Sequence, residues 1–500
     1  METMQTLAER LPQSLSGRIA LLAATAHIVL YVGRAIHNLY FSPLSRVPGP
    51  FWSRISEFPH SYNFMRGDGV PYVKSIHDRY GPVVRIAPNR ISYSTPTGFR
   101  TIYGKREHIK DPEMYIAPPS GAIGIMEADE VNHTRIRKYL GPAFSVKALE
   151  EQEGLIQGYV DQFIEGLRQR KNEMVDIDSW LDWTLYDMIG KLALDFDFEN
   201  TINARYHPRV NNMFTNFKLM GLFYAASAYP WFYTFVQQSL KMMFARRSEN
   251  YNFIQDVVKN RVRSQEKGKT DLWAYVLEHA NPGDLVEKEL ETTGWQIVIA
   301  GAETTSTVLS GAVYLLSVNP GRTQRLVKEL RKRFKSEKQI SFDSVAKIPY
   351  LIAVLEETLR FYPPAAFGVS RVVTQVEGSE IDKVWLPQGT RISASQYCVF
   401  RSQDNFAKPD EFVPERWLDD HDEVFENDNH DALMPFSYGK RNCIGRSLAI
   451  VQMRLILARL LWNFDVELCD QSRDWIEQRS FLGWEKPPLY VRLTDRHHRS

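Results

Sequence analysis

The 500-residue sequence contains only three cysteines, Cys398, Cys443 and Cys469. So small and odd a number excludes a disulfide scaffold in a chain this long and favours a reducing compartment. The 61 basic and 60 acidic residues nearly cancel, so we expect no nucleic-acid partner. Beyond about residue 50 the chain also lacks repeats, long Gly/Ser-rich stretches and blocks of like charge. Residues 51–500 are therefore predicted to form one large domain.

The N-terminus differs from this even composition. Residues 19–32 read IALLAATAHIVLYV, bounded by Arg18 and Arg34. A bilayer span needs about 20 apolar residues, but the arginine stems can lengthen a shorter one. We expect residues 1–42 to be a membrane anchor and the proline-rich residues 43–50 to be a hinge. A cleaved signal peptide or a buried helix is the alternative, although no clear small-x-small cleavage site follows.

The hydrophobic pattern predicts a mainly α fold with small β-sheets. Between about residues 150 and 360, apolar residues recur at i, i+3 and i+4 with few breakers, which is typical of helices. Extended stretches at 82–86 and 91–93 flank a turn and predict a hairpin. Further strands are predicted after Pro364, near 372–373, 381, 384–386 and 391–395. A last long helix is predicted to begin near Ile444.

The segment Phe436–Gly445 carries the strongest chemical signal. Gly439 and Gly445 would let the backbone approach a flat ligand, and Arg441 offers a fixed cation for a carboxylate. Cys443 lies just before a predicted helix, where the helix dipole lowers a thiol pKa and favours the metal-binding thiolate. The alternative is an inert buried thiol, which is the interpretation we give to Cys398 and Cys469.

These ten residues match the haem-binding loop Phe-x-x-Gly-x-Arg-x-Cys-x-Gly, and the chain resembles the cytochrome P450 family. The resemblance implies a haem b held between a long central helix and the Cys443 loop. It makes Cys443 the axial iron ligand, has Phe436 shield the sulfur, and pairs Arg441 with a haem propionate. A thiolate ligand favours cleavage of the O–O bond.

A second segment, Ala300–Thr305, places glycine, a carboxylate and threonine in an apolar helix, although burying a carboxylate is costly. Thr304 is expected to bond back to the carbonyl of Ala300 and open a groove for dioxygen. This resembles the family's oxygen-activating segment, with Glu303 and Thr304 as the catalytic proton-delivery pair. Without the Cys443 loop, a polar surface turn would explain the segment equally well.

Glu357 and Arg360 share a helix face, between an apolar run and the helix-ending prolines 363 and 364. An isolated pair of this kind is usually a solvated bridge, but this setting favours burial. The family's Glu-x-x-Arg has the same setting, and its partner arginine corresponds to Arg416. We assign the three residues a structural role.

Three further residues are expected to bind haem propionates because of the resemblance. His133 and Arg137 lie at i and i+4, where the family often has tryptophan and arginine, so His133 is a departure that keeps a hydrogen-bond donor. Arg371 is the third. A plain basic surface helix explains the neighbouring Arg135 and Lys138 equally well. At Gln452, where the family often has glutamate, we expect no catalytic consequence.

Within that family, the sequence most resembles enzymes of secondary metabolism from filamentous fungi. We expect a lipophilic small-molecule substrate, such as a terpenoid or polyketide. The segments expected to line its pocket are mostly apolar: 117–126, 214–235, 298–302, 365–369 and 480–482. Met213, Phe217, Met220, Phe223, Tyr224, Trp231 and Phe232 are expected to form either a membrane-facing lip or helix core.

No Gly-rich flavin or nicotinamide fingerprint accompanies the haem motif. Electrons are therefore expected from an NADPH-dependent diflavin reductase docking near Lys440 and Arg446, with the chain on the endoplasmic reticulum membrane facing the cytosol. The expected reaction is oxygen insertion from dioxygen: hydroxylation, epoxidation or multistep oxidation. Oxidative coupling, rearrangement or dehydration without oxygen insertion is the alternative, and a non-enzymatic haem or ligand carrier is a third hypothesis.

Overall fold

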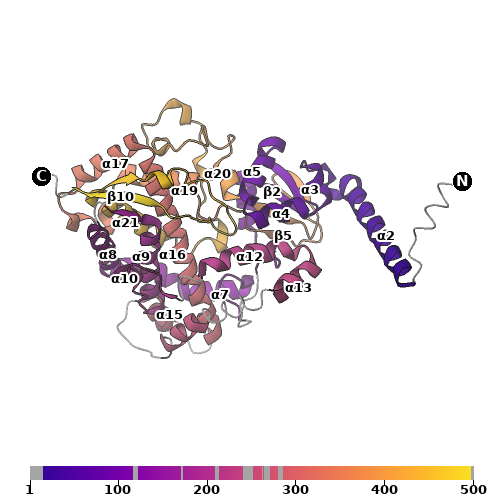
Figure 1. The fold of residues 1–500 in the computed structure, drawn as a ribbon, viewed down its shortest axis with the longest axis horizontal. Helices are drawn as coiled ribbons and strands as arrows, with labels where there is room; N and C mark the ends of the chain where they lie inside the picture. Colours follow the sequence, from indigo (N-terminus) through magenta and orange to yellow (C-terminus); the bar gives the residue numbers. More distant parts are fainter. Residues whose placement is uncertain are drawn as a thin grey trace.

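The computed structural model describes residues 15–115, 122–170, 173–208, 213–239, 252–261, 263, 271–279 and 285–496. Residues 117–121 of the predicted pocket segment 117–126 lie outside these residues, as do the side chains of Met213 and Phe217. Helices dominate, and the strands are short (Figure 1). The predicted fold class, mainly α with small β-sheets, is therefore confirmed.

The α-helices of the described residues are α2 (Leu15–Ile36), α3 (Phe51–Ile55), α4 (Phe58–Arg66), α5 (Gly69–Tyr80), α6 (Pro96–Gly104), α7 (Glu130–Leu140), α8 (Val146–Arg168), α9 (Ile177–Leu194), α10 (Asn200–Asn203), α12 (Met213–Ser227), α13 (Pro230–Ser239), α15 (Leu272–His279), α16 (Glu287–Ser317), α17 (Pro320–Arg333), α18 (Phe342–Val345), α19 (Pro349–Phe361), α20 (Gln396–Phe400) and α21 (Arg446–Asn463).

The strands of the described residues form three small sheets. They are β1 (Val83–Ala87), β2 (Arg90–Tyr93), β3 (His108–Lys110), β4 (Met174–Asp176), β5 (Arg371–Val373), β6 (Ser379–Ile381), β7 (Val384–Leu386), β8 (Arg391–Ala394), β9 (Phe464–Leu468) and β10 (Tyr490–Asp495). The largest sheet has the order β1-β2-β8-β5-β3, and the others are β4-β10-β9 and β6-β7. Strand β3 pairs with β5 so that Lys110 lies opposite Arg371. This register brings two cations together at the sheet edge nearest the Cys443 loop.

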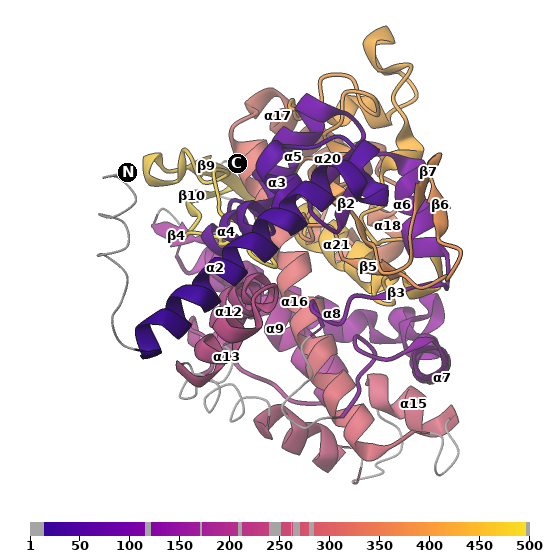
Figure 2. The same cartoon turned by 90° about the vertical axis from the view of Figure 1, so that its right-hand side faces the viewer.

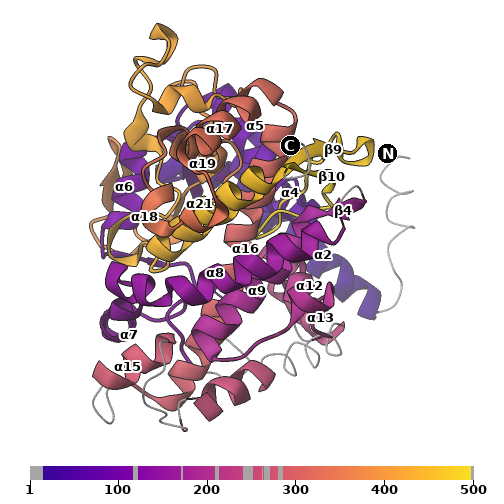
Figure 3. The same cartoon turned by 90° about the vertical axis from the view of Figure 1, so that its left-hand side faces the viewer.

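The long helix α16 crosses the body of the molecule (Figure 2), and its C-terminal half is buried in the main hydrophobic core. Helices α9 and α21 pack against it, and α8 packs against both of these helices (Figure 3). Caps define where these elements begin: Asp129 accepts the Asn132 N–H at the start of α7, and Ser145 accepts the Ala148 N–H at the start of α8. The segment that carries Cys443 directly precedes α21, which packs against α16.

The N-terminal helix α2 projects from the body (Figure 1), and its apolar side chains are largely exposed, for example Leu22 and Ile28. Across the described part of the chain, no helix combines the length and apolarity needed to cross a bilayer.

Candidate active site

The Cys443 loop is held by backbone and side-chain bonds. The Cys443 N–H donates to the Phe436 carbonyl at 2.8 Å, and the Asn442 N–H donates to Gly439 at 3.1 Å. From α7, Arg137 donates to the Asn442 carbonyl and to its Oδ1, both at 2.6 Å. The guanidinium of Arg137 thus fixes the residue next to the cysteine, and its predicted contact with a propionate stays a prediction.

The Cys443 side chain is exposed at the surface of its loop, although protein atoms enclose it on its other sides. That enclosure raises the thiol pKa, and a hydrogen bond from the Gly445 N–H together with Arg137 and Arg446 only partly opposes the rise. The prediction of a lowered thiol pKa at the helix start was therefore wrong, because desolvation outweighs the Gly445 N–H and the two arginines. Phe436 lies beside it, with its ring 5.7 Å from the Arg446 guanidinium.

Of the two glycines in the Cys443 loop, only Gly439 is required by the surrounding protein atoms. Gly439 has φ +76°, and a Cβ there would lie 2.6 Å from the Tyr103 carbonyl oxygen. Gly445 would place a Cβ no closer than 4.0 Å to Phe144. The neighbouring helix α6 therefore dictates Gly439, whereas no described protein atom excludes a side chain at Gly445.

Cationic side chains gather around a cavity of about 230 Å³ between α7, the β3–β5 edge and the Cys443 loop. Its lining includes Lys110, Arg371 and Arg441, and the buried His133 lies nearby. Burial and these cations lower the pKa of His133 to about 3, and burial with its arginine neighbours lowers that of Lys110 to about 7. The lining also holds the acidic Glu127, Asp129 and Glu130, but basic side chains outnumber them, so the cavity suits an anion.

The Nε atom of Arg371, which lines this cavity, lacks a hydrogen-bond partner among the described residues. The Arg371 side chain is buried. Arg441 donates to the Ala128 carbonyl at 2.9 Å and lies 3.4 Å from Glu130, so it is better compensated. A carboxylate entering the cavity would satisfy the buried Arg371 donor, which is the chemistry that two haem propionates offer.

On α16, Thr304 and Ala300 form the exposed face one turn apart. The Thr304 hydroxyl donates to the Ala300 carbonyl at 2.7 Å, which is the predicted back-bond. Gly301 faces elsewhere, because a Cβ there would lie 2.9 Å from Ile189 on α9. Of the predicted pocket segment 298–302, Val298 and Ala302 are fully buried in the core.

Glu303 lies on a different face of α16 from Thr304, since successive helical residues are about 100° apart. Its side chain is buried, and Oε1 lies 3.6 Å from the Lys486 ammonium. Burial raises the pKa of Glu303 to about 8, although Lys486 opposes the rise. Glu303 and Thr304 therefore lie on different faces of α16, and their predicted role as a proton-delivery pair stays a prediction.

Glu357, Arg360 and Arg416 form a network with fully buried side chains. The Glu357 carboxylate accepts two bonds of 2.8 Å from Arg360 and one of 3.3 Å from Arg416. Val413 N–H and the Trp417 indole N–H also donate to it. The network joins α19 to the segment that follows α20, as a structural role requires.

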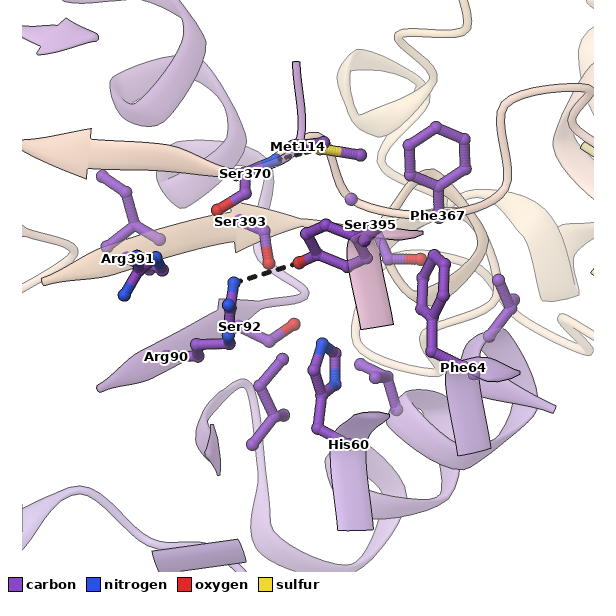
Figure 4. A pocket seen from close by; sticks show the side chains of 17 residues that line it. His60, Phe64, Arg90, Ser92, Met114, Phe367, Ser370, Arg391, Ser393 and Ser395 are labelled. Carbon is purple, nitrogen blue, oxygen red and sulfur yellow. Dashed lines mark hydrogen bonds between the residues drawn. The ribbon is translucent and has the colours of Figure 1, made fainter. Parts of the chain in front are cut away.

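Three of the predicted pocket segments converge on one apolar cluster. Phe64 and Met114 pack there with Tyr224, Phe367 and Leu482. The same cluster borders a small cavity of about 40 Å³ that the His60 ring helps to line (Figure 4). Neither His60 nitrogen has a hydrogen-bond partner among the described residues. Of the candidate lip residues, Phe223 and Tyr224 are buried core, whereas Trp231 is 75% exposed.

Sequence reasoning missed three residues of this site: Lys110, Asn442 and Lys486. Lys110 and Lys486 gave no local signal, because they reach the site only through strand pairing and the C-terminal segment. A signal for the Lys486 cluster did exist. Asp178 and Asp182 lie one turn apart in the mostly apolar helix α9, and such acids require a buried partner.

Comparison with known proteins agrees with this geometry. The family model described as Cytochrome P450 matches residues 48–493. The chain is 38% identical to cytochrome P450 monooxygenase astA of Talaromyces wortmannii, over 96% of this chain and 97% of that protein. It is 37% identical to averantin hydroxylase of Dothistroma septosporum (95% and 90% covered) and 36% identical to trichothecene C-4 hydroxylase of Trichoderma arundinaceum (93% and 94%). The chain therefore belongs to the cytochrome P450 family and is an oxidoreductase of the monooxygenase type.

Proposed function

We propose that this monooxygenase inserts oxygen into a lipophilic intermediate of fungal secondary metabolism. The observation that carries the proposal is the site itself: an exposed thiol on a clamped loop, an exposed threonine on α16, and a cavity whose lining has more basic than acidic side chains. Two similar proteins are named as hydroxylases of an averantin and of a trichothecene, which supports hydroxylation as the reaction.

The family implies a haem-thiolate cofactor, and we propose haem b. Cys443 would be the axial ligand, with Phe436 beside the sulfur. Arg371, Arg441 and His133 would hold the propionates, and the orphaned Arg371 Nε fits this role. Arg137 would act through Asn442, keeping the cysteine loop in place. When bound, a thiolate-ligated haem supplies the oxygen-activating chemistry.

For the protein's own part in the reaction, we propose that Thr304 positions water and dioxygen on the exposed face of α16, and that Glu303 supplies protons. The support for Thr304 is its exposed position and its bond back to Ala300. The support for Glu303 is its burial beside Lys486, which leaves it with a pKa of about 8 and lets it carry a proton near neutral pH. The mostly apolar cluster around Phe64 and Phe367 suits a lipophilic substrate.

Labelled dioxygen tests the reaction class. The purified enzyme, with reductase and NADPH, would be given the product of the preceding step of its biosynthetic gene cluster. We expect one labelled oxygen atom in the product for each hydroxylation. A product of coupling, rearrangement or dehydration that carries no label would instead establish the alternative chemistry. No turnover with any candidate, despite an intact ferrous carbon monoxide spectrum, would favour a carrier.

We propose that a diflavin reductase delivers the electrons at the surface around the Cys443 loop. Lys440 and Arg446 are exposed there and suit an acidic partner. Lys440→Glu should slow first electron transfer and weaken its dependence on salt, measured by stopped-flow reduction under carbon monoxide. Lys383→Glu, a charge reversal in the exposed β6–β7 hairpin, is the control. Equal rates for both variants would place the docking surface elsewhere.

We also propose attachment of the N-terminal segment to the endoplasmic reticulum membrane with the catalytic domain in the cytosol. The support is a run of exposed apolar side chains along α2, together with exposed Trp52, Phe58 and Trp231. Co-sedimentation with phospholipid vesicles should therefore require residues 1–42. Equal binding of a variant lacking these residues would contradict the assignment.

A further inference from the structure

The strongest unexplained feature lies behind α16, where Lys486 gathers three carboxyl groups. Its Nζ lies 3.0 Å from Asp178, 3.1 Å from Asp182 and 3.6 Å from Glu303. It also donates to Ser306 at 3.1 Å. All four charged side chains are at most 10% exposed. Three carboxylates and one ammonium would leave two buried negative charges, which is costly unless protons are bound.

The backbone around Lys486 is firmly held, so the ammonium is a fixed charge. The Trp484 indole donates to the Pro363 carbonyl at 2.8 Å, and its ring stacks on Tyr362. The Leu489 N–H donates to Asp176 at 2.9 Å. Pro487 and Pro488 follow Lys486 and restrict the chain further. The position of the Lys486 ammonium relative to the three carboxyl groups is therefore fixed by the backbone that carries it.

The three carboxyl groups are not bound equally. Asp178 also accepts the Ser310 hydroxyl at 2.7 Å, and Asp182 accepts the Tyr206 hydroxyl at 2.9 Å. Glu303 is the most distant from the ammonium, and its Oε2 is buried without any partner among the described residues. A bare buried carboxylate oxygen is unfavourable, whereas a protonated carboxyl costs less to bury. Glu303 is thus the member of the cluster best placed to take up and release a proton.

We infer that Lys486 is the positioning residue of this enzyme's proton supply, its fixed ammonium setting how readily Glu303 gives up a proton toward the Thr304 face. The inference rests on the proposed function of Glu303. In each transfer the Glu303 carboxyl loses one proton, its carboxylate is stabilised by Lys486, and solvent returns one proton. Dioxygen and electrons are those of the monooxygenase reaction itself.

The surrounding charges agree with this assignment. Burial raises the pKa of Asp178 to about 7 and that of Glu303 to about 8. Burial alone would lower the pKa of Lys486, but the carboxyl groups outweigh it and hold that pKa well above its usual range. The ammonium therefore stays charged while protons move among its partners. The titratable groups that face this pair are Asp176, Asp178, Asp182, Tyr186, Tyr206 and Tyr362.

Infrared titration of the haem-loaded enzyme tests the inference without any substrate. The carbonyl stretch of the protonated Glu303 carboxyl is identified by its loss in Glu303→Gln. Lys486→Gln keeps a hydrogen-bond donor but removes the charge, and should move the disappearance of this band upward by at least one pH unit. Lys486→Arg should restore it. Lys191→Gln, which removes the charge of another ion pair on α9, should leave it unchanged.

A second variant keeps the test decisive if Lys486→Gln does not fold. Asp182→Asn retains the ammonium and removes a competing carboxylate, so the Glu303 band should titrate at a lower pH. Unshifted titration in Lys486→Gln, or in Asp182→Asn if only that variant folds, overturns the inference. So does the absence of a band that depends on Glu303.

Turnover measurements distinguish the role of Lys486 from the proposed role of Glu303 as proton donor. In NADPH oxidation with reductase, Lys486→Gln should move the high-pH limb of the rate upward by the same interval, and Lys486→Arg should not. A Glu303→Gln variant with wild-type rate and pH profile would end both the proton-supply proposal and the inference. A changed Glu303→Gln profile with an unchanged Lys486→Gln profile would end the inference alone.

Discussion

Replacing Glu357 with alanine should be among the most destabilising single changes in this protein. The carboxylate accepts five hydrogen bonds, two of them from Arg360, and no part of it is exposed. In Glu357→Ala, Arg360 keeps only the carbonyls of Phe400, Pro409 and Glu411, so its buried charge loses its counterion. Arg416 is affected less because it still pairs with Asp428.

Breaking a buried ion pair costs about 3–5 kcal/mol. Native proteins are stable by about 5–15 kcal/mol, so the loss would consume much of the total. It corresponds to a change of about 100-fold to 4,000-fold in the ratio of folded to unfolded protein. The matched control is Asp343→Ala, which removes an i,i+4 partner from the exposed Lys347 and should cost less than about 0.5 kcal/mol.

Urea unfolding of the haem-loaded protein, followed by tryptophan fluorescence, measures these differences. The double variant Glu357→Met/Arg360→Met removes both charges and should be less destabilised than Glu357→Ala, since no uncompensated charge remains. A loss below about 1 kcal/mol in Glu357→Ala, no larger than typical of a surface substitution, would refute the reasoning. So would a double variant as unstable as the single one.

Four further outcomes are expected. Cys443→Ser should abolish the red-shifted Soret band of the ferrous carbon monoxide complex, and a persisting band would contradict the ligand assignment. Thr304→Ala should keep that band but release more hydrogen peroxide per NADPH; fully coupled turnover would remove Thr304 from the proton path. Arg371→Met should speed haem loss to an apomyoglobin acceptor by about tenfold to a hundredfold, the value of one charge-assisted bond, without destabilising the haem-free protein. Burial lowers the pKa of His60 to about 3. The unfolded chain therefore binds a proton that the native state does not, and stability falls by up to about 1.4 kcal/mol per pH unit as pH drops from 6.5 toward 3. His60→Phe should flatten that slope in acid denaturation, whereas His37→Gln, at an exposed position, should not.

Hydrophobic patterns and turn residues in the sequence were sufficient to predict several helices and strands near the site. The predicted hairpin at 82–86 and 91–93 is β1 and β2, and the helix expected near Ile444 is α21, which begins at Arg446. Strand signals at 372–373 and 391–395 correspond to β5 and β8. The parallel pairing of β2 with β8 and the β4-β10-β9 sheet were not predicted. The β2–β8 and β4–β10 pairings join segments some 300 residues apart, and nothing in a local hydrophobic pattern encodes them.

The same limit explains why the surroundings of the site residues could not be predicted. A motif identified Glu303 and Thr304 as neighbours in sequence, but helix geometry turns adjacent side chains onto different faces. What surrounds Glu303 was decided by α9 and by the C-terminal segment carrying Lys486. The pKa of Cys443 was likewise misjudged, because the sequence shows the following helix but not the protein atoms that desolvate the thiol.

Gly301 and Gly439 lie in motifs assigned to catalysis, but helix packing is the reason that these positions exclude a side chain. The atoms that exclude a side chain there belong to Ile189 and Tyr103. Gly439 also needs a positive φ, so any L-residue would be strained there even if α6 moved away. Gly301 fixes how closely α16 approaches α9, the helix that carries Asp178 and Asp182. A bulkier residue at Gly301 would therefore act on the reaction indirectly, by separating Glu303 from the charges that set its proton affinity.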